Sequence, residues 1–338
     1  MKLSSNVHLD SHLFGMSRIG IVWKNMSSSA IGTLDSADHI EGRAPAPSAA
    51  VHGALAGCAS VLLGFCVLAA PPGAMGFAKP LIIATLVLLP CLMLPAAYFH
   101  ERKAWQKRDA ALMLPWALLL AALVTEVAPT SATFAFPLRD MLWRSIDEHL
   151  WIRVPSIMAF TARHAWLQTV LTFSYYWTLH PLLLSAILLP ALMGRVQAAQ
   201  RFLLVNAMGF VLALPFMLML PAVGPWVAWH FEPNWIQRSC EVSILSLRKG
   251  SFASGGLFGG IVCLPSFHAF WALVAAHALQ SFRWLRFLAI ALAVLITVST
   301  VTTGWHYGVD VLAGILFAIT TTYLASLVVP VASQSKTR

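Results

Sequence analysis

Three ionisable side chains whose spacing suits acid–base and nucleophilic chemistry lie in the apolar stretch from Cys263 to Gly314. His306 and Asp310 are four residues apart, so on a helix they would share one face, and the carboxylate could accept the proton of one imidazole nitrogen. The other nitrogen is then available as a nucleophile or base. His268 opens an earlier apolar segment, from which it could donate a proton to a leaving oxygen.

Pro265 and Ser266 stand directly before this segment, at the predicted start of a helix. The free N–H groups of the following turn and the serine hydroxyl would hold an anion there. A bound phosphate, a nucleophilic histidine and an acid on the opposite side are the parts of a phosphoryl transfer without a metal. We therefore expect His268, His306 and Asp310 to be catalytic and Ser266 to help bind phosphate. No ligand set with metal-binding spacing accompanies them, so neither a metal nor a cofactor is expected.

The composition predicts that these residues are positioned by a membrane protein. Of 338 residues, 59% are hydrophobic and only 10% are charged, whereas soluble domains carry roughly 25% charged residues. The net charge of +9 then indicates basic cytoplasmic loops beside anionic lipid, and nucleic acid is not an expected partner.

The predicted fold class is all-α, a polytopic membrane helix bundle of about eight transmembrane helices. Apolar runs near the roughly 20 residues that a bilayer requires lie at about 51–70, 80–98, 110–129, 168–191, 202–222, 265–281, 284–304 and 306–329. The loops that fall on one side are basic, so the positive-inside rule places both termini in the cytoplasm. Two crossings separate His268 from His306, which predicts that they meet at the outer face. In a bacterium this would be the inner membrane.

Five segments make up the predicted organisation. They are a cytoplasmic tail at 1–50, three transmembrane helices at 51–129, an outer interfacial amphipathic segment at 130–167, a core at 168–329 and a second cytoplasmic tail at 330–338. In the interfacial segment Leu138, Met141, Leu142 and Ile146 fall on one helical side and the charges on the other.

Five cysteines show no metal-type spacing. Cys240 and Cys263 bracket one outer loop and would form a disulfide only if that loop faces an oxidising space. The other three, Cys58, Cys66 and Cys91, lie in apolar segments and are most simply small core residues.

The motifs Pro265-Ser266-Phe267-His268 and His306-x-x-x-Asp310 resemble those of the type-2 phosphatidic acid phosphatase superfamily, over roughly residues 168–329. The resemblance implies a six-helix core. It also implies that His306 forms a phosphohistidine, Asp310 orients it, His268 protonates the leaving alcohol and Ser266 helps to bind phosphate.

Two departures from the superfamily pattern concern the charge that meets the phosphate. The third motif begins Ser-Arg in the family, but here Ser299 precedes Thr300, and the basic first motif is absent. The pattern LPAVGPW, SLRKGSF, LPSFH and GWHYGVD resembles the branch that includes inositol phosphorylceramide synthase. That branch suggests Arg248 as a phosphate partner; the alternative is an ordinary interfacial arginine.

The expected function is a lipid phosphotransferase that moves a phosphorylated head group between lipids. Its partners would be a membrane lipid phosphoester and an alcohol acceptor. If water takes the place of the alcohol, the same site gives a lipid phosphate phosphatase. A second alternative is a non-enzymatic protein: either a lipid transporter that uses His and Asp as a proton relay, or a lipid-binding homologue that has lost catalysis.

Overall fold

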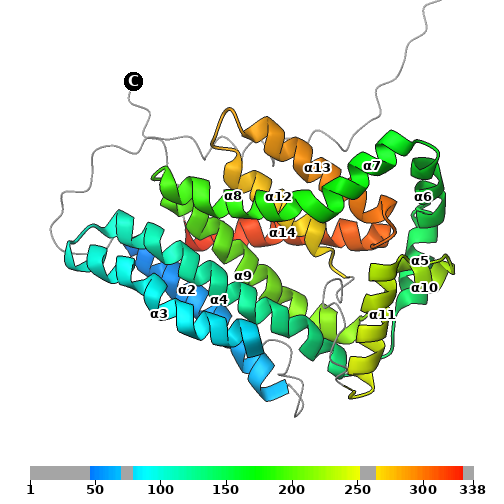
Figure 1. Cartoon of the computed structure of the whole chain (residues 1–338), viewed down its shortest axis with the longest axis horizontal. Helices are drawn as coiled ribbons and strands as arrows, with labels where there is room; N and C mark the ends of the chain where they lie inside the picture. Colours follow the sequence, from blue (N-terminus) through cyan, green and yellow to red (C-terminus); the bar gives the residue numbers. More distant parts are fainter. Residues whose placement is uncertain (1–45, 70–78, 252–263, 330–338) are drawn as a thin grey trace, which may run out of the picture. The chain divides into compact units, whose positions relative to one another are not determined.

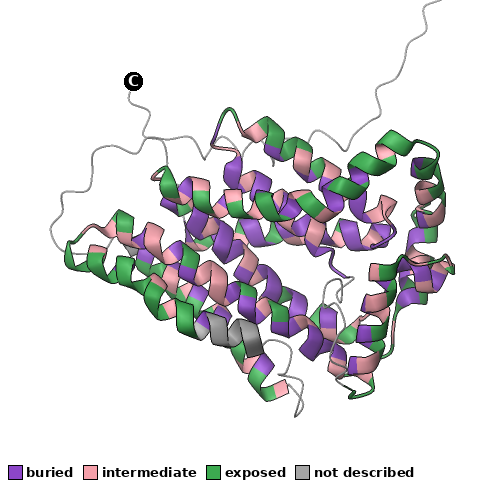
Figure 2. Ribbon diagram, in the orientation of Figure 1, coloured by how far each residue is buried: buried purple, intermediate pink, exposed green. Residues whose placement is uncertain are grey.

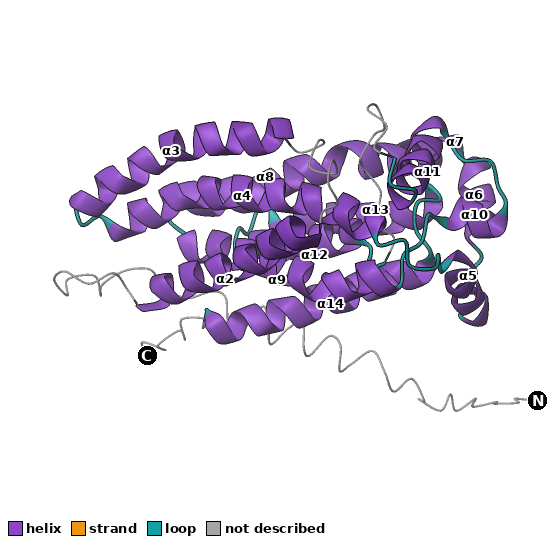
Figure 3. Cartoon of the chain, turned by 90° about the horizontal axis from the view of Figure 1, so that it is seen from below, coloured by secondary structure: helices purple, strands orange, loops and turns teal. Residues whose placement is uncertain are grey.

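The computed structural model describes residues 46–69, 79–251 and 264–329, and every regular element in these ranges is a helix (Figure 3). Both predicted tails, apart from residues 46–50, lie outside the described residues, as does Cys263 of the predicted disulfide. The elements are α2 (Ala46–Ala69), α3 (Lys79–Glu101), α4 (Trp105–Thr133), α5 (Asp140–His149), α6 (Val154–Ala162), α7 (Ala165–Phe173), the π-helix η2 (Ser174–Thr178), α8 (Leu179–Leu192), α9 (Val196–Met219), α10 (Pro225–Trp229), α11 (Trp235–Arg248), α12 (Phe267–Leu279), α13 (Arg286–Thr302) and α14 (Gly308–Val328).

Five helical stretches are long and apolar enough to cross a membrane. They are Ser48–Ala69, Trp105–Thr133, Ala165–Leu192, Val196–Met219 and Gly308–Val328. Shorter apolar helices cover Val87–Glu101, Phe267–Leu279 and Arg286–Thr302. The chain is thus a multi-pass helical membrane protein, as predicted. Helices α12 and α13, with 13 and 17 residues, are shorter than the other candidate spans, whereas the whole of α3 has 23 residues. The count of eight transmembrane helices stays a prediction.

Helix α9 lies within the bundle and packs against α2, α4, α8, α12 and α14. It is buried over much of its surface, while α3 is largely exposed (Figure 2). Its contact with α12 is close because Gly209 has no side chain: a Cβ there would lie 2.5 Å from Cζ of Phe270, which is fully buried. Apolar packing in the bundle therefore fixes where α12 begins, and with it the position of His268.

Four shorter helices, α5, α6, α10 and α11, lie together at one end of the bundle (Figures 1 and 3). Helix α5 is amphipathic, as the sequence predicts. The face that it buries against the protein is the acidic one, with Asp140 4% exposed, Trp143 5% and Asp147 0%. Met141 and Leu142 are exposed. Leu138 and Ile146, on the same predicted apolar side, pack partly against the protein. The position of this segment along the membrane interface stays a prediction.

Candidate active site

His306 lies in a tight turn between α13 and α14, two residues before α14 begins. The prediction that His306 shares a helix with Asp310 is wrong, because α14 begins only at Gly308. The turn is held by the carbonyl of Thr300, which accepts from the backbone N–H groups of Trp305 at 3.2 Å and His306 at 3.1 Å. Gly304, with φ of 73°, supplies the left-handed conformation that closes it. The turn buries the imidazole of His306, which is 5% exposed.

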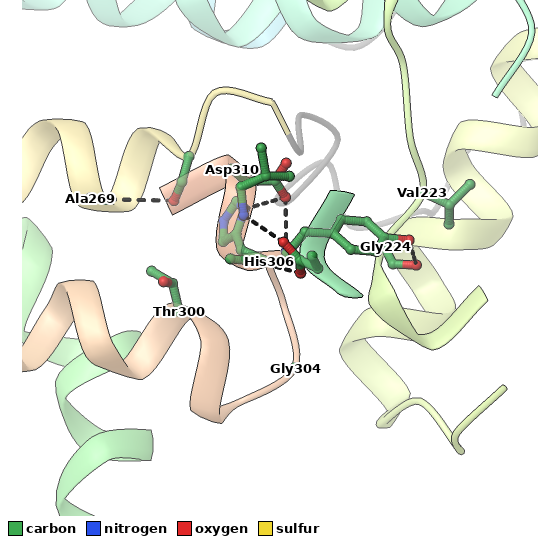
Figure 4. Close-up of polar contacts among 12 residues, drawn as sticks. Val223, Gly224, Ala269, Thr300, Gly304, His306 and Asp310 are labelled. Carbon is green, nitrogen blue, oxygen red and sulfur yellow. Dashed lines mark hydrogen bonds and ion pairs between the residues drawn. The ribbon is translucent and has the colours of Figure 1, made fainter. Parts of the chain in front are cut away.

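Asp310 still reaches His306, because it lies in the first turn of α14 and its side chain folds back. Its Oδ2 lies 3.6 Å from Nδ1 of His306 and accepts the backbone N–H of Tyr307 at 2.9 Å (Figure 4). The Nδ1 atom is buried and has no hydrogen-bond partner within normal range. At 3.6 Å the carboxylate attracts a proton on Nδ1, and a small movement would complete the hydrogen bond.

His268 lies beside these two residues. Its ring centroid is 5.9 Å from that of His306, with the planes at 58°. On its other side the ring of Tyr175 stacks on it, with centroids 4.4 Å apart and planes 14° apart. The structure therefore brings together the three residues that the sequence singled out. Their catalytic roles remain predictions.

Ser266 is fully buried and links α12 to α14. Its Oγ accepts the N–H of Ala269 at 3.5 Å as the cap of α12, and its own N–H donates to the carbonyl of Asp310 at 2.9 Å. The approach depends on Gly314, where a Cβ would lie 2.4 Å from the carbonyl oxygen of Ser266. The first turns of α12 and α14 thus meet through their backbones. The hydroxyl proton of Ser266 is not used by the cap.

Arg248 ends α11, and its Nη2 donates to the carbonyls of Ala135 at 3.2 Å and Phe136 at 2.7 Å. Burial lowers the pKa of this guanidinium, and the charge of Asp140 opposes that shift. None of the hydrogen bonds given for Arg248 goes to His268, His306 or Asp310. A role in phosphate binding remains a prediction for this residue.

The sequence analysis missed two buried aspartates that α5 directs at the same region. Asp140 accepts the N–H groups of Val223 at 3.0 Å and Gly224 at 2.9 Å, and the hydroxyl of Tyr307 at 3.0 Å. Asp147 accepts the N–H groups of Gly308 and Val309, each at 2.8 Å. Both carboxylates therefore bind the residues that directly follow His306.

Burial raises the pKa of both carboxyls. For Asp140 the three donors oppose the shift. For Asp147 burial raises the pKa to about 6, against the two backbone N–H groups, and the charge of Asp310 adds to the rise. A signal for the pair was present: with Trp143 they fall at i, i+3 and i+7, which is one face of a helix.

A cavity of about 370 Å³ lies beside the His306 turn. Its wall includes Tyr176, whose hydroxyl accepts the indole N–H of Trp305 at 3.0 Å. Gln237 lines it too and donates to the carbonyl of Gly304 at 3.1 Å. The remaining lining residues come from α6, α7, the end of α13 and the segment before α11. The cavity reaches Thr302 and Thr303 just before the turn, but His268, His306 and Asp310 are not among its lining residues.

The fold and site define a class: a multi-pass helical membrane protein with two adjacent histidines and a supporting carboxylate. A model of the PAP2 superfamily matches residues 142–324, more than half of the chain, and the protein belongs to this superfamily. No match was found among curated proteins or among solved structures. Membership together with the apolar helices indicates a membrane lipid phosphatase or phosphotransferase.

Proposed function

We propose that the protein is a membrane-embedded lipid phosphotransferase that moves a phosphorylated head group from one lipid to another through a phosphohistidine at His306. The observation that carries the proposal is the pair of imidazoles 5.9 Å apart with a carboxylate at Nδ1 of one of them. This separation of the rings leaves room for one phosphorus atom between a nucleophilic His306 and an acidic His268.

In the first half-reaction, the lone pair on Nε2 of His306 forms a bond to phosphorus, and the bond from phosphorus to the donor lipid's oxygen breaks. Protonated His268 gives its proton to that oxygen. Asp310 holds the proton on Nδ1 of His306 and stabilises the positive charge that develops on the ring. In the second half-reaction, an acceptor hydroxyl attacks phosphorus, His268 takes its proton, and the nitrogen–phosphorus bond breaks.

The phosphoryl oxygens would lie at the start of α12. The N–H groups of Phe267 and His268 in this first turn have no carbonyl partner within the helix, and such groups bind anions. Ser266 has a hydroxyl proton to add. With threonine at position 300 and few cations nearby, a phosphodiester, which carries about one negative charge less than a monoester, fits this site better.

The proposed orientation has both termini in the cytoplasm and the active site at the outer face. It is supported by the basic residues Arg195 and Arg286, which lie at the opposite ends of α9 and α13 from the catalytic turn. The end of the bundle formed by α5, α6, α10 and α11 would then cover the outer side.

The test is covalent trapping. Purified protein receives phosphatidylinositol or phosphatidic acid labelled with radioactive phosphorus, with or without ceramide or diacylglycerol as acceptor. We expect acid-labile label on His306 from the diester, and its transfer to the acceptor. His306→Gln should abolish labelling, while His164→Gln, at an exposed histidine between α6 and α7, should not change it.

The products separate the alternatives. Release of free phosphate from phosphatidic acid, with no product that contains the acceptor, would make the protein a lipid phosphatase that uses the same site. Absence of label in the presence of every donor and acceptor would count against covalent chemistry and favour a lipid-binding or transport function.

A further inference from the structure

We propose that Asp147 is a positioning residue for His306: by holding the first two N–H groups of α14, it keeps Asp310 turned toward the imidazole. The proposal rests on the proposed function for its catalytic consequence, but its structural content can be tested without it. Asp147 touches neither the imidazole nor the space for substrate in any described contact, so its effect would pass through α14.

The geometry places Asp147 at the positive end of α14. Its side chain is fully buried, Oδ2 accepts from Gly308 and Oδ1 from Val309, both at 2.8 Å. These are the donors that a helix start leaves without partners. A carboxylate from another helix therefore binds two first-turn donors that an N-cap side chain or water would otherwise satisfy.

Gly308 allows the close approach. A Cβ at this position would lie 2.5 Å from Cδ1 of Ile152 and 3.3 Å from Oδ1 of Asp147. The segment from α5 into the α5–α6 connection is thus packed directly against the backbone two residues after His306. Any movement of α5 at this point moves the catalytic turn.

This arrangement would affect the orientation of the Asp310 side chain. Asp310 is the third residue of α14, and its Oδ2 accepts the N–H of Tyr307, the residue before the helix, which is the capping-box contact expected of this position. With Gly308 and Val309 already bound by Asp147, its Oδ2 serves only Tyr307 among the described hydrogen bonds and lies 3.6 Å from Nδ1 of His306. Without Asp147, the open N–H groups would draw Asp310 away from the imidazole.

The test compares Asp147→Asn and Asp147→Ala with Glu148→Gln. Glu148 is the next residue of α5, and its partly exposed side chain pairs with Arg144 at 3.0 Å. With labelled phosphatidylinositol and ceramide, we expect kcat to fall roughly 10-fold for Asn and 100-fold for Ala, because small misplacements of a reacting group have effects of this size. The KM should stay within about twofold. Glu148→Gln should match the wild type.

Two readouts decide the proposal even if the protein transfers nothing. Amide hydrogen exchange at Gly308 and Val309 should accelerate in both Asp147 variants and not in Glu148→Gln. The rate at which diethyl pyrocarbonate modifies His306, measured by mass spectrometry, should change as well. Unchanged exchange and unchanged modification would overturn the proposal, and so would wild-type kcat in an active enzyme. Absence of activity in the wild type would instead reject the proposed function alone.

Discussion

Two buried carboxylates, Asp109 and Asp147, are satisfied in opposite ways. Asp109, which is 5% exposed near the start of α4, faces a cation: Nε of Arg108 donates to its Oδ1 at 2.8 Å. The Nη2 atom of Arg108 also donates to Ser48 on α2 at 3.1 Å. Asp147, at the catalytic end, accepts only backbone N–H groups in its described hydrogen bonds, and the like charge of Asp310 raises its pKa.

The difference indicates what each group is for. Arg108 and Asp109 are neighbours on α4, and their contacts with Ser48 of α2 and Gln200 of α9 connect α4 to both helices, which suits a role in packing. A carboxylate without a cation keeps a cost of burial that two N–H donors do not fully offset. Such a cost is typical of residues that serve a site rather than stability.

The largest effect on kcat is expected at Asp310. Asp310→Asn keeps the shape of the side chain but removes the charge that holds the proton on Nδ1 of His306. In hydrolases with a comparable aspartate–histidine pair, this change lowers kcat by roughly 10⁴-fold. We expect a loss of at least about 10³-fold in label transfer, with little change in the temperature of unfolding. A variant that retains more than a tenth of wild-type kcat would remove Asp310 from the mechanism.

At Asp109 we expect the opposite result, a loss of stability without a loss of kcat. Asp109→Ala leaves the guanidinium of Arg108 buried without its partner, and breaking such a pair destabilises a protein by about 3–5 kcal/mol. The folded fraction that remains should transfer label at the wild-type rate. The double variant Arg108→Leu/Asp109→Leu is the control, because it removes both charges and should recover most of the stability. Equal loss in the single and double variants would mean that the charges are not a pair.

The titration of Asp147 sharpens the comparison. Its pKa is raised from 3.8 to about 6, so the folded chain keeps a proton that the unfolded chain releases near pH 4. Stability from this group is present below about pH 4 and is lost as pH rises to about 6, a difference of about 3 kcal/mol at most. Asp147→Asn should remove this dependence and should not lower the unfolding temperature at pH 8. A large fall at pH 8 would show that the carboxylate stabilises the fold.

The meeting of His268, His306 and Asp310 could be predicted from the sequence. The apolar runs and basic loops put two membrane crossings between the two motifs, so both motifs lie at the same side of the membrane. The roles of Asp140 and Asp147 could not be derived in the same way. A helical spacing shows that α5 has two faces, but not which one meets protein. In water the apolar face goes inside, whereas beside a bilayer lipid can cover it, and the acidic face is then free to bind backbone N–H groups.

The turn before α14 shows a second limit. The spacing of His306 and Asp310 is the same on a helix and in a turn followed by a helix start, so sequence spacing alone does not distinguish them. The structure does so through Gly304 and the carbonyl of Thr300, which accepts two successive N–H groups. The glycine was visible in the sequence, but the carbonyl contact depends on where α13 ends.

The smallest effect on kcat among the variants at the catalytic end is expected from Tyr307→Phe. This change removes a contact of Asp140 and leaves the contacts of Asp147 intact, so it tests the two aspartates of α5 separately. The hydroxyl lies 3.0 Å from Oδ1 of Asp140 and 3.0 Å from the carbonyl of Gly224. Its loss should cost about 2 kcal/mol of stability, since hydrogen bonds to charged groups contribute this much. Val223 and Gly224 still donate to Asp140, and the backbone N–H of residue 307 still binds Asp310. The kcat should therefore change less than about threefold, measured by label transfer at constant folded fraction. A fall as large as that of Asp147→Asn would mean that Asp140 positions the catalytic turn as strongly as Asp147 does.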